Sequence, residues 1–319
     1  MAIPYLYRMM GVIYNHSQLR GKSMTSKNKA PVIKSVCTDM LNINLQLNEE
    51  GIKQVEKNLI EMSEQYGITP FTKYGYREVI PLLTEEQKKS ILFCSNHKYP
   101  SRPYVHLQLN PSELDKTLAT SLRGDLNWLL GNCYKQFFLN SSVTRLDIAV
   151  DYLNLNVDDC LFNNTRQRRS AAYFNQSGQT ESVYLGHRKS LVQMRIYDKS
   201  AKNRSKHNVA DTEQVTRIEA TVNPKCTFAD IHKIKNPYEG LKIYKLSGLI
   251  ADNRIPLSFC DSIQLRGLTA TLNLLAPDER KAVKSLLEQH VFVDFPADQI
   301  FQLWKASLKK IVPLKYVKP

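Results

Sequence analysis

The sequence lacks several patterns that would assign it to a common functional class. Its six cysteines form no C-x-x-C pair and no His/Cys cluster, so they predict neither a zinc site nor a disulfide framework. This cysteine usage favours a reducing, cytoplasmic location. There is no G-x-x-x-x-G-K-[ST] loop, so no NTPase activity is predicted. There is also no run of about 18 apolar residues, and we therefore expect no membrane span.

Acidic residues are few compared with basic ones. The 319 residues include 44 Lys and Arg against 30 Asp and Glu, a formal net charge of +14. Such an excess predicts a polyanionic partner, with nucleic acid first and an anionic membrane surface second. Residues 1–38 contain no acid at all, and we interpret residues 1–31 as a basic flexible arm. Apolar residues make up 42%, which is ordinary for a chain of one large or two modest domains.

One pattern occurs twice, in residues 143–151 and again in residues 215–222. Each copy has a β-branched residue, a threonine, an arginine, an aliphatic residue and an acid in the same order. Because successive side chains of a strand point to opposite faces, each copy predicts a strand with one apolar face and one charged face. For one such strand alone, a salt bridge on a half-exposed sheet would be a sufficient explanation. The charged faces would carry Arg145, Asp147, Asp151, Arg217 and Glu219.

Two further segments alternate in the same way, at residues 104–109 and 190–199. Their polar positions carry His106, Gln108, Arg195, Tyr197 and Lys199. Side by side, the four strands would gather acids, a histidine, basic residues and a tyrosine on one face of a sheet. That is more polar chemistry than a solvated face requires, and it predicts a functional site.

The order of these motifs resembles that of rolling-circle replication initiators of the Rep_trans type. Those proteins are encoded by plasmids and filamentous phages, and phage gene II proteins and relaxases of integrative elements are similar to them. Each motif is weak alone, and the order of the four carries the resemblance, which covers residues 104–222. One departure is Gln108, because related proteins often have His-hydrophobic-His where this chain has His-Leu-Gln. The motifs are R-x-D-x-A-x-D at residues 145–151, Y-x-G-x-R-x-S at 184–190, R-I-Y-D-K at 195–199 and R-x-E at 217–219.

The resemblance implies a nucleophilic tyrosine and a divalent metal. Tyr197 would attack a phosphodiester and form a phosphotyrosine ester, which a DNA 3′-hydroxyl can later attack. Arg195 would hold the phosphate, and Lys199, expected on the strand face of Tyr197, would lower the tyrosine pKa or neutralise the phosphate. Carboxylates suit a hard ion such as Mg²⁺ or Mn²⁺, which would stabilise charge during the displacement. The candidate ligands, in order of preference, are Asp147, Glu219, His106, Asp151 and Gln108.

Basic residues with interleaved aromatic residues fill residues 165–206. Positive groups position phosphates, and aromatic rings stack on unpaired bases with a gain of ~1–3 kcal/mol per base. The alternative is an ordinary exposed hairpin with basic tips. The candidate DNA-binding residues are Arg145, Arg217, Arg166, Arg168, Arg169, Arg188, Lys189 and Tyr184.

The predicted fold is α+β: a mainly antiparallel sheet with helices on its apolar face and an open polar face for DNA. It resembles the rolling-circle initiator and relaxase nuclease fold. We expect a DNA-nicking catalytic domain at residues 32–225 and an accessory region at 226–319, for duplex recognition or for oligomerisation such as a homodimer. The sequence pattern predicts helices at residues 48–65, from 111 towards 138, and at 277–290 and 299–312, with short strands or loops at 241–249 and 255–265.

The predicted function is initiation of rolling-circle replication. The protein would nick one strand of an origin, stay joined through Tyr197 to the 5′-phosphate and leave a 3′-hydroxyl as primer. A host helicase and polymerase would be needed as partners, because the sequence has no nucleotide-binding loop of the P-loop type. Three alternatives stay open: a conjugative relaxase with the same chemistry, a non-catalytic DNA-binding protein such as a repressor, and a metal-dependent nuclease that uses water.

Overall fold

The computed structural model describes residues 29–73, 76–82, 92–95, 103–167, 169–207, 213–251 and 254–308. Most of the predicted basic arm, residues 1–28, lies outside the described residues, and so does the candidate residue Arg168. Within the described ranges, no helix combines the length and the apolar character that crossing a membrane requires.

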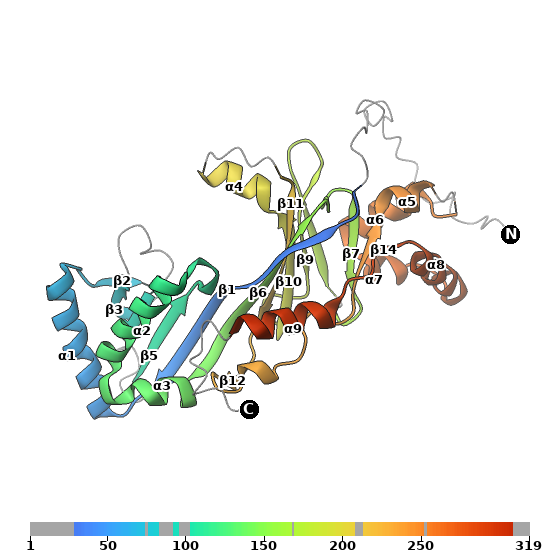
Figure 1. Cartoon of the computed structure of the whole chain (residues 1–319). Coiled ribbons are helices and arrows are strands. Elements are labelled where there is room, and N and C mark those ends of the chain that lie inside the picture. The colour runs from blue at the N-terminus through green and yellow to red at the C-terminus, as the bar shows by residue number, and fades with distance from the viewer. Residues whose placement is uncertain are drawn as a thin grey trace.

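One long sheet runs through the molecule (Figure 1). Its strand order is β2-β3-β4-β5-β1-β6-β11-β10-β9-β8, and β12 pairs with β6 beside this path. Every described pairing in this sheet is antiparallel. Together with the helices, the sheet confirms the predicted α+β class. The strands are β1 (Val32–Gln46), β2 (Phe71–Lys73), β3 (Tyr76–Pro81), β4 (Leu92–Ser95), β5 (Tyr104–Leu109), β6 (Ser142–Leu153), β8 (Ser170–Phe174), β9 (Thr180–Leu185), β10 (Val192–Asp198), β11 (Val215–Val222) and β12 (Cys226–Thr227).

The alternation predicted for the central strands is confirmed. Ile148 on β6, Ile196 on β10 and Ile218 on β11 are all fully buried in the main hydrophobic core. Because side chains alternate along a strand, the residues directly before and after each isoleucine lie on the opposite, polar face. The repeated sequence pattern therefore marks the two strands at the centre of the sheet, β6 and β11, which are direct neighbours.

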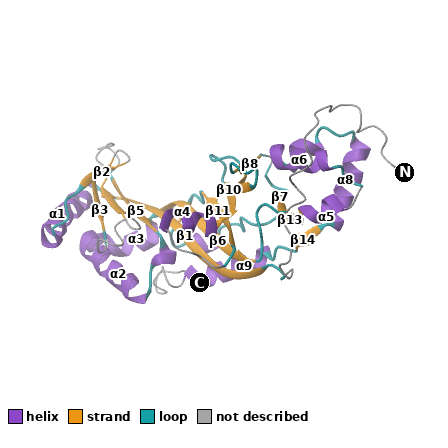
Figure 2. Cartoon of the chain, turned by 90° about the horizontal axis from the view of Figure 1, so that it is seen from above, coloured by secondary structure: helices purple, strands orange, loops and turns teal. Residues whose placement is uncertain are grey.

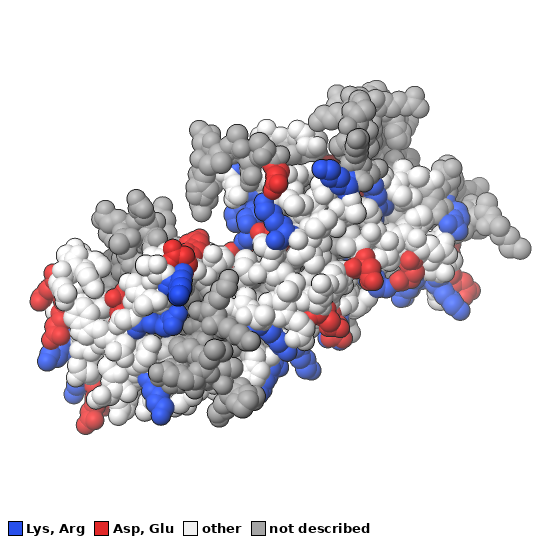
Figure 3. Space-filling view, viewed as in Figure 1, with Lys and Arg blue, Asp and Glu red and all other residues white. Residues whose placement is uncertain are grey.

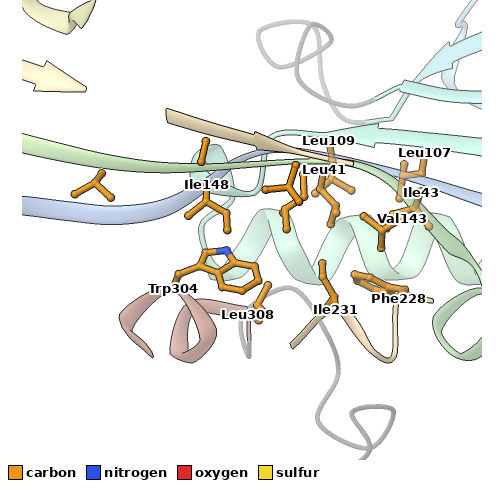
Figure 4. Packing of buried hydrophobic residues seen from close by; sticks show 14 of the residues in the cluster. Leu41, Ile43, Leu107, Leu109, Val143, Ile148, Phe228, Ile231, Trp304 and Leu308 are labelled. Carbon is orange, nitrogen blue, oxygen red and sulfur yellow. The ribbon is translucent and has the colours of Figure 1, made fainter. Parts of the chain in front are cut away.

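Three helices cover the apolar face: α2 (Lys116–Leu130), α3 (Tyr134–Asn140) and α9 (Ala297–Ser307). In Figure 4, Trp304 lies beneath the sheet residue Ile148. Trp304 is fully buried, and its indole nitrogen donates a hydrogen bond of 3.0 Å to the Thr38 hydroxyl on β1. A helix from the C-terminal part of the chain thus closes the core that the N-terminal strands begin.

Helix α1 (Glu49–Tyr66) confirms the helix predicted at residues 48–65. Asn48 caps its N-terminus by accepting a hydrogen bond of 2.9 Å from a backbone amide in its first turn. Gly67 ends it in the left-handed conformation, with a φ of 61°. The Asn58 side chain donates a hydrogen bond to the Trp128 carbonyl, which fixes α1 against α2.

The helix predicted from residue 111 towards 138 is divided into four parts, the third being a 3-10 helix at Gly131–Cys133. A 3-10 helix spans Pro111–Glu113, and α2 begins after Asp115, whose side chain caps it. Gly131 then separates α2 from α3. Its φ of 48° lies in the left-handed region, which glycine adopts without steric cost.

A second, smaller core lies at one end of the molecule, opposite α1 in Figure 2. The prediction of strands or loops at residues 255–265 was wrong here, because Phe259, Cys260 and Ile263 bury one face of a helix. The predicted helices at 277–290 and 299–312 correspond to α8 and α9. The elements of this end are β14 (Val291–Val293), β13 (Leu241–Lys245) and β7 (Cys160–Asn164) in one sheet, and α5 (Leu246–Ala251), α6 (Leu257–Arg266), α7 (Leu268–Leu272) and α8 (Pro277–Gln289).

The described residues from 226 to 308 do not pack as a separate unit. Phe228, Tyr238 and Trp304 belong to the main core, together with strands from the predicted catalytic domain. The Tyr238 hydroxyl donates a hydrogen bond of 2.7 Å to the Ile148 carbonyl on β6. The boundary expected at residue 225 therefore does not separate two cores, and an accessory role for the region stays a prediction.

Candidate functional site

The strand registers place the predicted polar residues on one face of the sheet. Arg217 on β11 pairs with Asp151 on β6 and with Tyr197 on β10. Two residues further along β11, Glu219 pairs with Arg195 on β10. Directly paired residues point to the same face of a sheet. These five side chains, predicted from three separate segments, therefore form one group.

The same face continues across β1 to β5. Gln108 pairs with Asn42, which in turn pairs with Arg145 on β6. His106 pairs with Asn44, and its ring nitrogen Nδ1 is 2.5 Å from the Asn44 side-chain oxygen. Burial lowers the pKa of His106 to about 4, so this histidine is neutral near pH 7.

The centre of the polar face is buried, which corrects the expectation that this face is open. Asp147 exposes 2% of its surface, Asp151 4% and Glu219 9%. The charged groups there bind one another, as described next, and therefore do not depend on water. Helix α4 (Lys199–His207) also contacts β11 on this part of the sheet (Figure 1).

Arg217 lies at the centre of a buried ion network. Its Nε is 2.7 Å from one Asp151 oxygen, and its NH1 is 2.6 Å from Asp39 on β1. The Nζ of Lys199 is 2.7 Å from the other Asp151 oxygen. Burial alone would raise the pKa of Asp151, but the hydrogen bonds and charges of Arg217 and Lys199 outweigh it and lower that pKa. Asp151 is thus held by two cations, which leaves it poorly placed as a metal ligand.

Lys199 does not share a strand face with Tyr197, contrary to the prediction. Strand β10 ends at Asp198, and Lys199 is the first residue of α4. The Asp198 carboxylate accepts a hydrogen bond of 2.9 Å from the Ala201 amide, as a helix-capping residue does. The change from strand to helix directs Lys199 to Asp151 and brings Lys202, one turn later, next to Tyr197.

The Tyr197 hydroxyl lies between a carboxylate and an ammonium group. It donates a hydrogen bond of 3.5 Å to Glu219, and it accepts one of 3.3 Å from the Nζ of Lys202. The guanidinium carbon of Arg195 is 4.5 Å from the centre of the Tyr197 ring, and the Lys202 Nζ is 4.7 Å from it. Burial and the negative charge of Glu219 raise the pKa of Tyr197 above its ordinary value. Sequence analysis did not single out Lys202, although Asp198 could have signalled the start of a helix.

Asp147 and Glu219 lie close enough for their charges to interact. Burial, followed by the negative charges of Asp147 and Asp39, raises the pKa of Glu219. Asp147 is already bound by Arg145, whose Nε and NH2 lie 3.0 and 2.6 Å from its two oxygens. Glu219 therefore has a higher affinity for a proton than an ordinary carboxylate has.

The five predicted metal ligands do not form one cluster. Among the described residues, no group of three or more His, Cys, Asp or Glu side chains is placed to hold a metal ion. His106 contacts Asn44, and Asp151 binds Arg217 and Lys199. Of the predicted set, Asp147 and Glu219 interact through their charges, and Asp147 is already bound by Arg145. The full predicted ligand set therefore does not fit a metal centre.

The predicted DNA-binding residues are dispersed. Arg145 and Arg217 are engaged by the carboxylates of the site, and Arg166 forms an ion pair with Glu239. Figure 3 shows Lys and Arg side chains gathered beside α4 on the visible face. Tyr184 lies beside the site, with its ring centre 5.5 Å from the Arg195 guanidinium. Of the predicted DNA-binding residues, three others are exposed on the surface: Arg169, Arg188 and Lys189.

No protein-family model matches the chain, and no curated protein matches its sequence. Among solved structures, the chain is similar to the rolling circle replication initiator protein from Geobacillus stearothermophilus. The two share 15% sequence identity, the match covers 74% of this chain and 98% of that one, and the TM-score is 0.39. At this TM-score the match does not establish a shared fold, and the function proposed below rests on the residues of the site itself.

Proposed function

We propose that this protein is a DNA-nicking and strand-transfer endonuclease of the rolling-circle initiator kind, with Tyr197 as its nucleophile. The observation that carries the proposal is the Tyr197 hydroxyl, 3.5 Å from the Glu219 carboxylate and 3.3 Å from the Lys202 ammonium group. A proton acceptor on one side and a positive charge on the other are what a phenol needs to become a nucleophile. A tyrosine that serves only for packing needs neither.

In the proposed reaction, Tyr197 transfers its proton to Glu219 and its oxygen attacks the phosphorus of one DNA strand. The bond from phosphorus to the 3′-oxygen breaks, and that oxygen takes up a proton and leaves as a 3′-hydroxyl. The 5′-phosphate remains as an ester on Tyr197. A DNA 3′-hydroxyl can later attack the same phosphorus and release the tyrosine, so the phosphodiester bond is conserved.

Two cations beside Tyr197 support a phosphate at this position. Lys202 contacts the Tyr197 hydroxyl, and its charge favours the phenolate over the phenol. Arg195 lies over the ring, and its buried Nε has no hydrogen-bond partner among the described residues. A phosphate oxygen would satisfy this donor, because guanidinium groups bind phosphates through such hydrogen bonds.

A divalent ion, Mg²⁺ or Mn²⁺, is a separate part of the proposal. When bound, it would polarise the phosphate oxygens and stabilise the charge that develops during displacement. Asp147 and one oxygen of Glu219 would hold it, and the Glu219 oxygen that accepts the Tyr197 hydrogen bond would remain the proton acceptor. The proposed reaction does not use the ion, because no three candidate ligands cluster among the described residues.

The proposed substrate is one strand of a replication origin, either single-stranded or extruded as a hairpin, in a plasmid or phage genome. Replication from the released 3′-hydroxyl would then depend on a helicase and a polymerase of the host. A conjugative relaxase would perform the same reaction at the same tyrosine. The two differ in the DNA site and in the partners, which a nicking assay on isolated DNA does not distinguish.

Covalent capture tests the proposal. Wild-type and Tyr197→Phe proteins are incubated with Mn²⁺ and a labelled pool of random-sequence single-stranded DNA, then denatured and separated on gels. We expect protein-linked DNA with the wild type and none with the variant, and sequencing of the captured DNA identifies the preferred site. Cleavage that survives the substitution would instead indicate a water-using nuclease or another nucleophile, Tyr184 first.

A non-catalytic DNA-binding protein, such as a repressor, is the second candidate. The burial of Tyr197 favours it, because only 4% of this residue is exposed and its pKa is raised. Such a phenol stays protonated unless DNA or an ion changes its surroundings. This candidate predicts DNA binding without a covalent adduct in either protein, an outcome that the capture assay detects directly.

A further inference from the structure

An aromatic pocket lies directly beside Tyr197. It has a volume of about 340 Å³, within the range of ligand-sized pockets, which is roughly 300–1,000 Å³. Strands β8, β9 and β10 and helix α4 supply its walls. The lining comprises three tyrosines (Tyr173, Tyr184 and Tyr197), two cations (Arg195 and Lys202), two acids (Glu181 and Asp198), and Ser182 and Ala201. The Asp198 carboxylate accepts a hydrogen bond from the Ala201 amide at the start of α4.

The outer wall of this pocket is a pair of tyrosines. Tyr173 and Tyr184 make an edge-to-face contact, with ring centres 5.4 Å apart and an angle of 74° between the rings. Tyr173 is 56% exposed, on the last strand of the sheet. An edge-to-face contact leaves part of an exposed ring uncovered, and a flat aromatic ligand can stack on that part.

The inner wall carries positive charge. Arg195 lies between two rings, 5.5 Å from the centre of Tyr184 and 4.5 Å from that of Tyr197. Lys202 is close enough that burial and the charge of Arg195 lower its pKa. An anion between the two cations would relieve this repulsion, and the unpartnered Nε of Arg195 offers it a hydrogen bond.

Flat rings outside and cations inside match the two parts of a nucleotide. We infer that the pocket holds one unpaired nucleotide of a single DNA strand, with its base stacked on Tyr173 and its phosphate near Arg195 and Lys202. Duplex DNA does not fit this arrangement, because its bases are already stacked on each other. The inference rests on the proposed function for its substrate class, and it adds Tyr173 as the residue that positions the strand beside Tyr197.

A binding cycle between the base and the tyrosine tests this inference. Two fluorescein-labelled probes are used, a 15-nucleotide dT oligomer and an abasic oligomer of the same length, which has the phosphates but no bases. Affinities are measured by anisotropy in EDTA, and gels verify that the DNA stays intact. We expect Tyr173→Ala to weaken dT binding about tenfold, as loss of one stacked base would. We expect little change on the abasic oligomer.

Two further variants show whether the effect belongs to the ring of Tyr173. Tyr173→Phe should bind dT as the wild type does, because stacking needs the ring and not the hydroxyl. Tyr66→Ala is the matched control. Tyr66 is 53% exposed and also makes an edge-to-face contact, at 6.2 Å from Trp128, but it lies on α1 at the other end of the molecule. It should leave both affinities unchanged.

Several outcomes would overturn the inference. One is that Tyr173→Ala loses as much affinity for the abasic oligomer as for the dT oligomer. Another is that Tyr173→Ala loses no affinity for dT. A third is that Tyr66→Ala loses as much affinity for dT as Tyr173→Ala does. Failure of the wild type to bind the dT oligomer up to ~100 µM, a typical limit for non-specific binding, would also overturn it. The assay does not require cleavage, so it is independent of the capture experiment. If Tyr173 supports base-dependent binding but no protein-linked DNA forms, only the proposed nicking activity is rejected. If protein-linked DNA forms but binding does not depend on Tyr173, only the proposed nucleotide pocket is rejected.

Discussion

Tyr197 and Glu219 occupy diagonal positions on β10 and β11, with the tyrosine hydroxyl 3.5 Å from a carboxylate oxygen. The surroundings raise the pKa of both groups: burial and Glu219 act on Tyr197, and burial and Asp147 act on Glu219. A carboxylate with a raised pKa is a better proton acceptor, but a phenol with a raised pKa releases its proton less readily. The positive charges of Lys202 and Arg195 are therefore an essential part of the proposed site.

Replacement of Glu219 by glutamine should slow adduct formation by a factor on the order of 10²–10⁴, the usual contribution of a general base. In the wild type, the rate should rise with pH as Glu219 loses its proton, above the ordinary range for a carboxyl group. This rise should be absent in the variant. Single-turnover rates on captured substrate DNA provide the measurement. Glu213→Gln is the control, because Glu213 is exposed and binds Lys34 away from the site. Equal rates for Glu219→Gln and the wild type would show that Glu219 is not the proton acceptor.

Lys202 and Lys199 should have different roles. Lys202→Met should slow adduct formation about tenfold or more and leave the thermal midpoint nearly unchanged, because Lys202 is exposed and contacts the Tyr197 hydroxyl. Lys199→Met should lower the free energy of unfolding by about 1 kcal/mol, since it removes one of the two cations at Asp151. Adduct kinetics and denaturant midpoints of both variants test the assignment. If Lys199→Met slowed adduct formation and Lys202→Met did not, Lys199 would have the role predicted from the sequence, which is to lower the Tyr197 pKa or neutralise the phosphate.

Acid should destabilise the protein partly through His106. In the folded protein its pKa is about 4, against an ordinary value of 6.5. Below pH 6.5 the unfolded chain gains a proton at this histidine that the folded chain does not bind, so stability falls between about pH 6.5 and 4. The loss should be on the order of 3 kcal/mol. Denaturant unfolding at several pH values, compared between wild type and His106→Asn, isolates this contribution.

The control for His106 is the exposed residue His187. His187→Asn makes the same replacement at an exposed position outside the core, and its unfolding is measured beside that of His106→Asn. The prediction would be contradicted if the free energy of unfolding changed with pH in the same way in the wild type and in His106→Asn.

Mn²⁺ binding should depend on the Asp147–Glu219 pair. At 1 mM, the ion should stabilise the wild type by about 1–3 kcal/mol if its dissociation constant is 10–100 µM or so, and Asp147→Asn should lose this stabilisation. Thermal unfolding with and without Mn²⁺ provides a measurement that does not involve activity. Asp151→Asn should be less stable but should keep the Mn²⁺ effect, because Asp151 is bound by the buried Arg217 and by Lys199. The ion-pair partner of Asp147 is Arg145, whose side chain is half-exposed and can give way to an ion. Loss of the effect in Asp151→Asn alone would restore Asp151 as a ligand.

Much of the sheet could be predicted from local sequence. The period of two in a strand makes the sorting of Ile148, Ile196 and Ile218 from the polar residues a property of each segment by itself. The ends of α1 were likewise local, because Asn48 and Gly67 act on the backbone next to them. The error at residues 255–265 arose because a short apolar segment does not by itself distinguish a strand from a helix.

The sequence indicated which polar residues share a sheet face, but it indicated neither their partners nor the contacts made by Asp39 and Lys202. Sequence alternation determined that the residues of β6, β10 and β11 share one polar face. It could not determine that Asp151 binds Arg217 and Lys199, because ion pairs depend on the register between strands and on the turn at Asp198. The position of Lys202 depends on the same turn.

By itself, the sequence determined the basic charge of the chain, the two faces of its central strands and the helix ends that have local caps. These follow from interactions within a few residues. Only the tertiary structure decided which carboxylates are bound by cations and which can accept a proton. It also decided that Lys202 contacts the Tyr197 hydroxyl and that Trp304 packs into the core with a hydrogen bond to Thr38. Such contacts join residues far apart in the chain, and their energies arise from burial and charge pairing that exist only after the strands and helices have packed together.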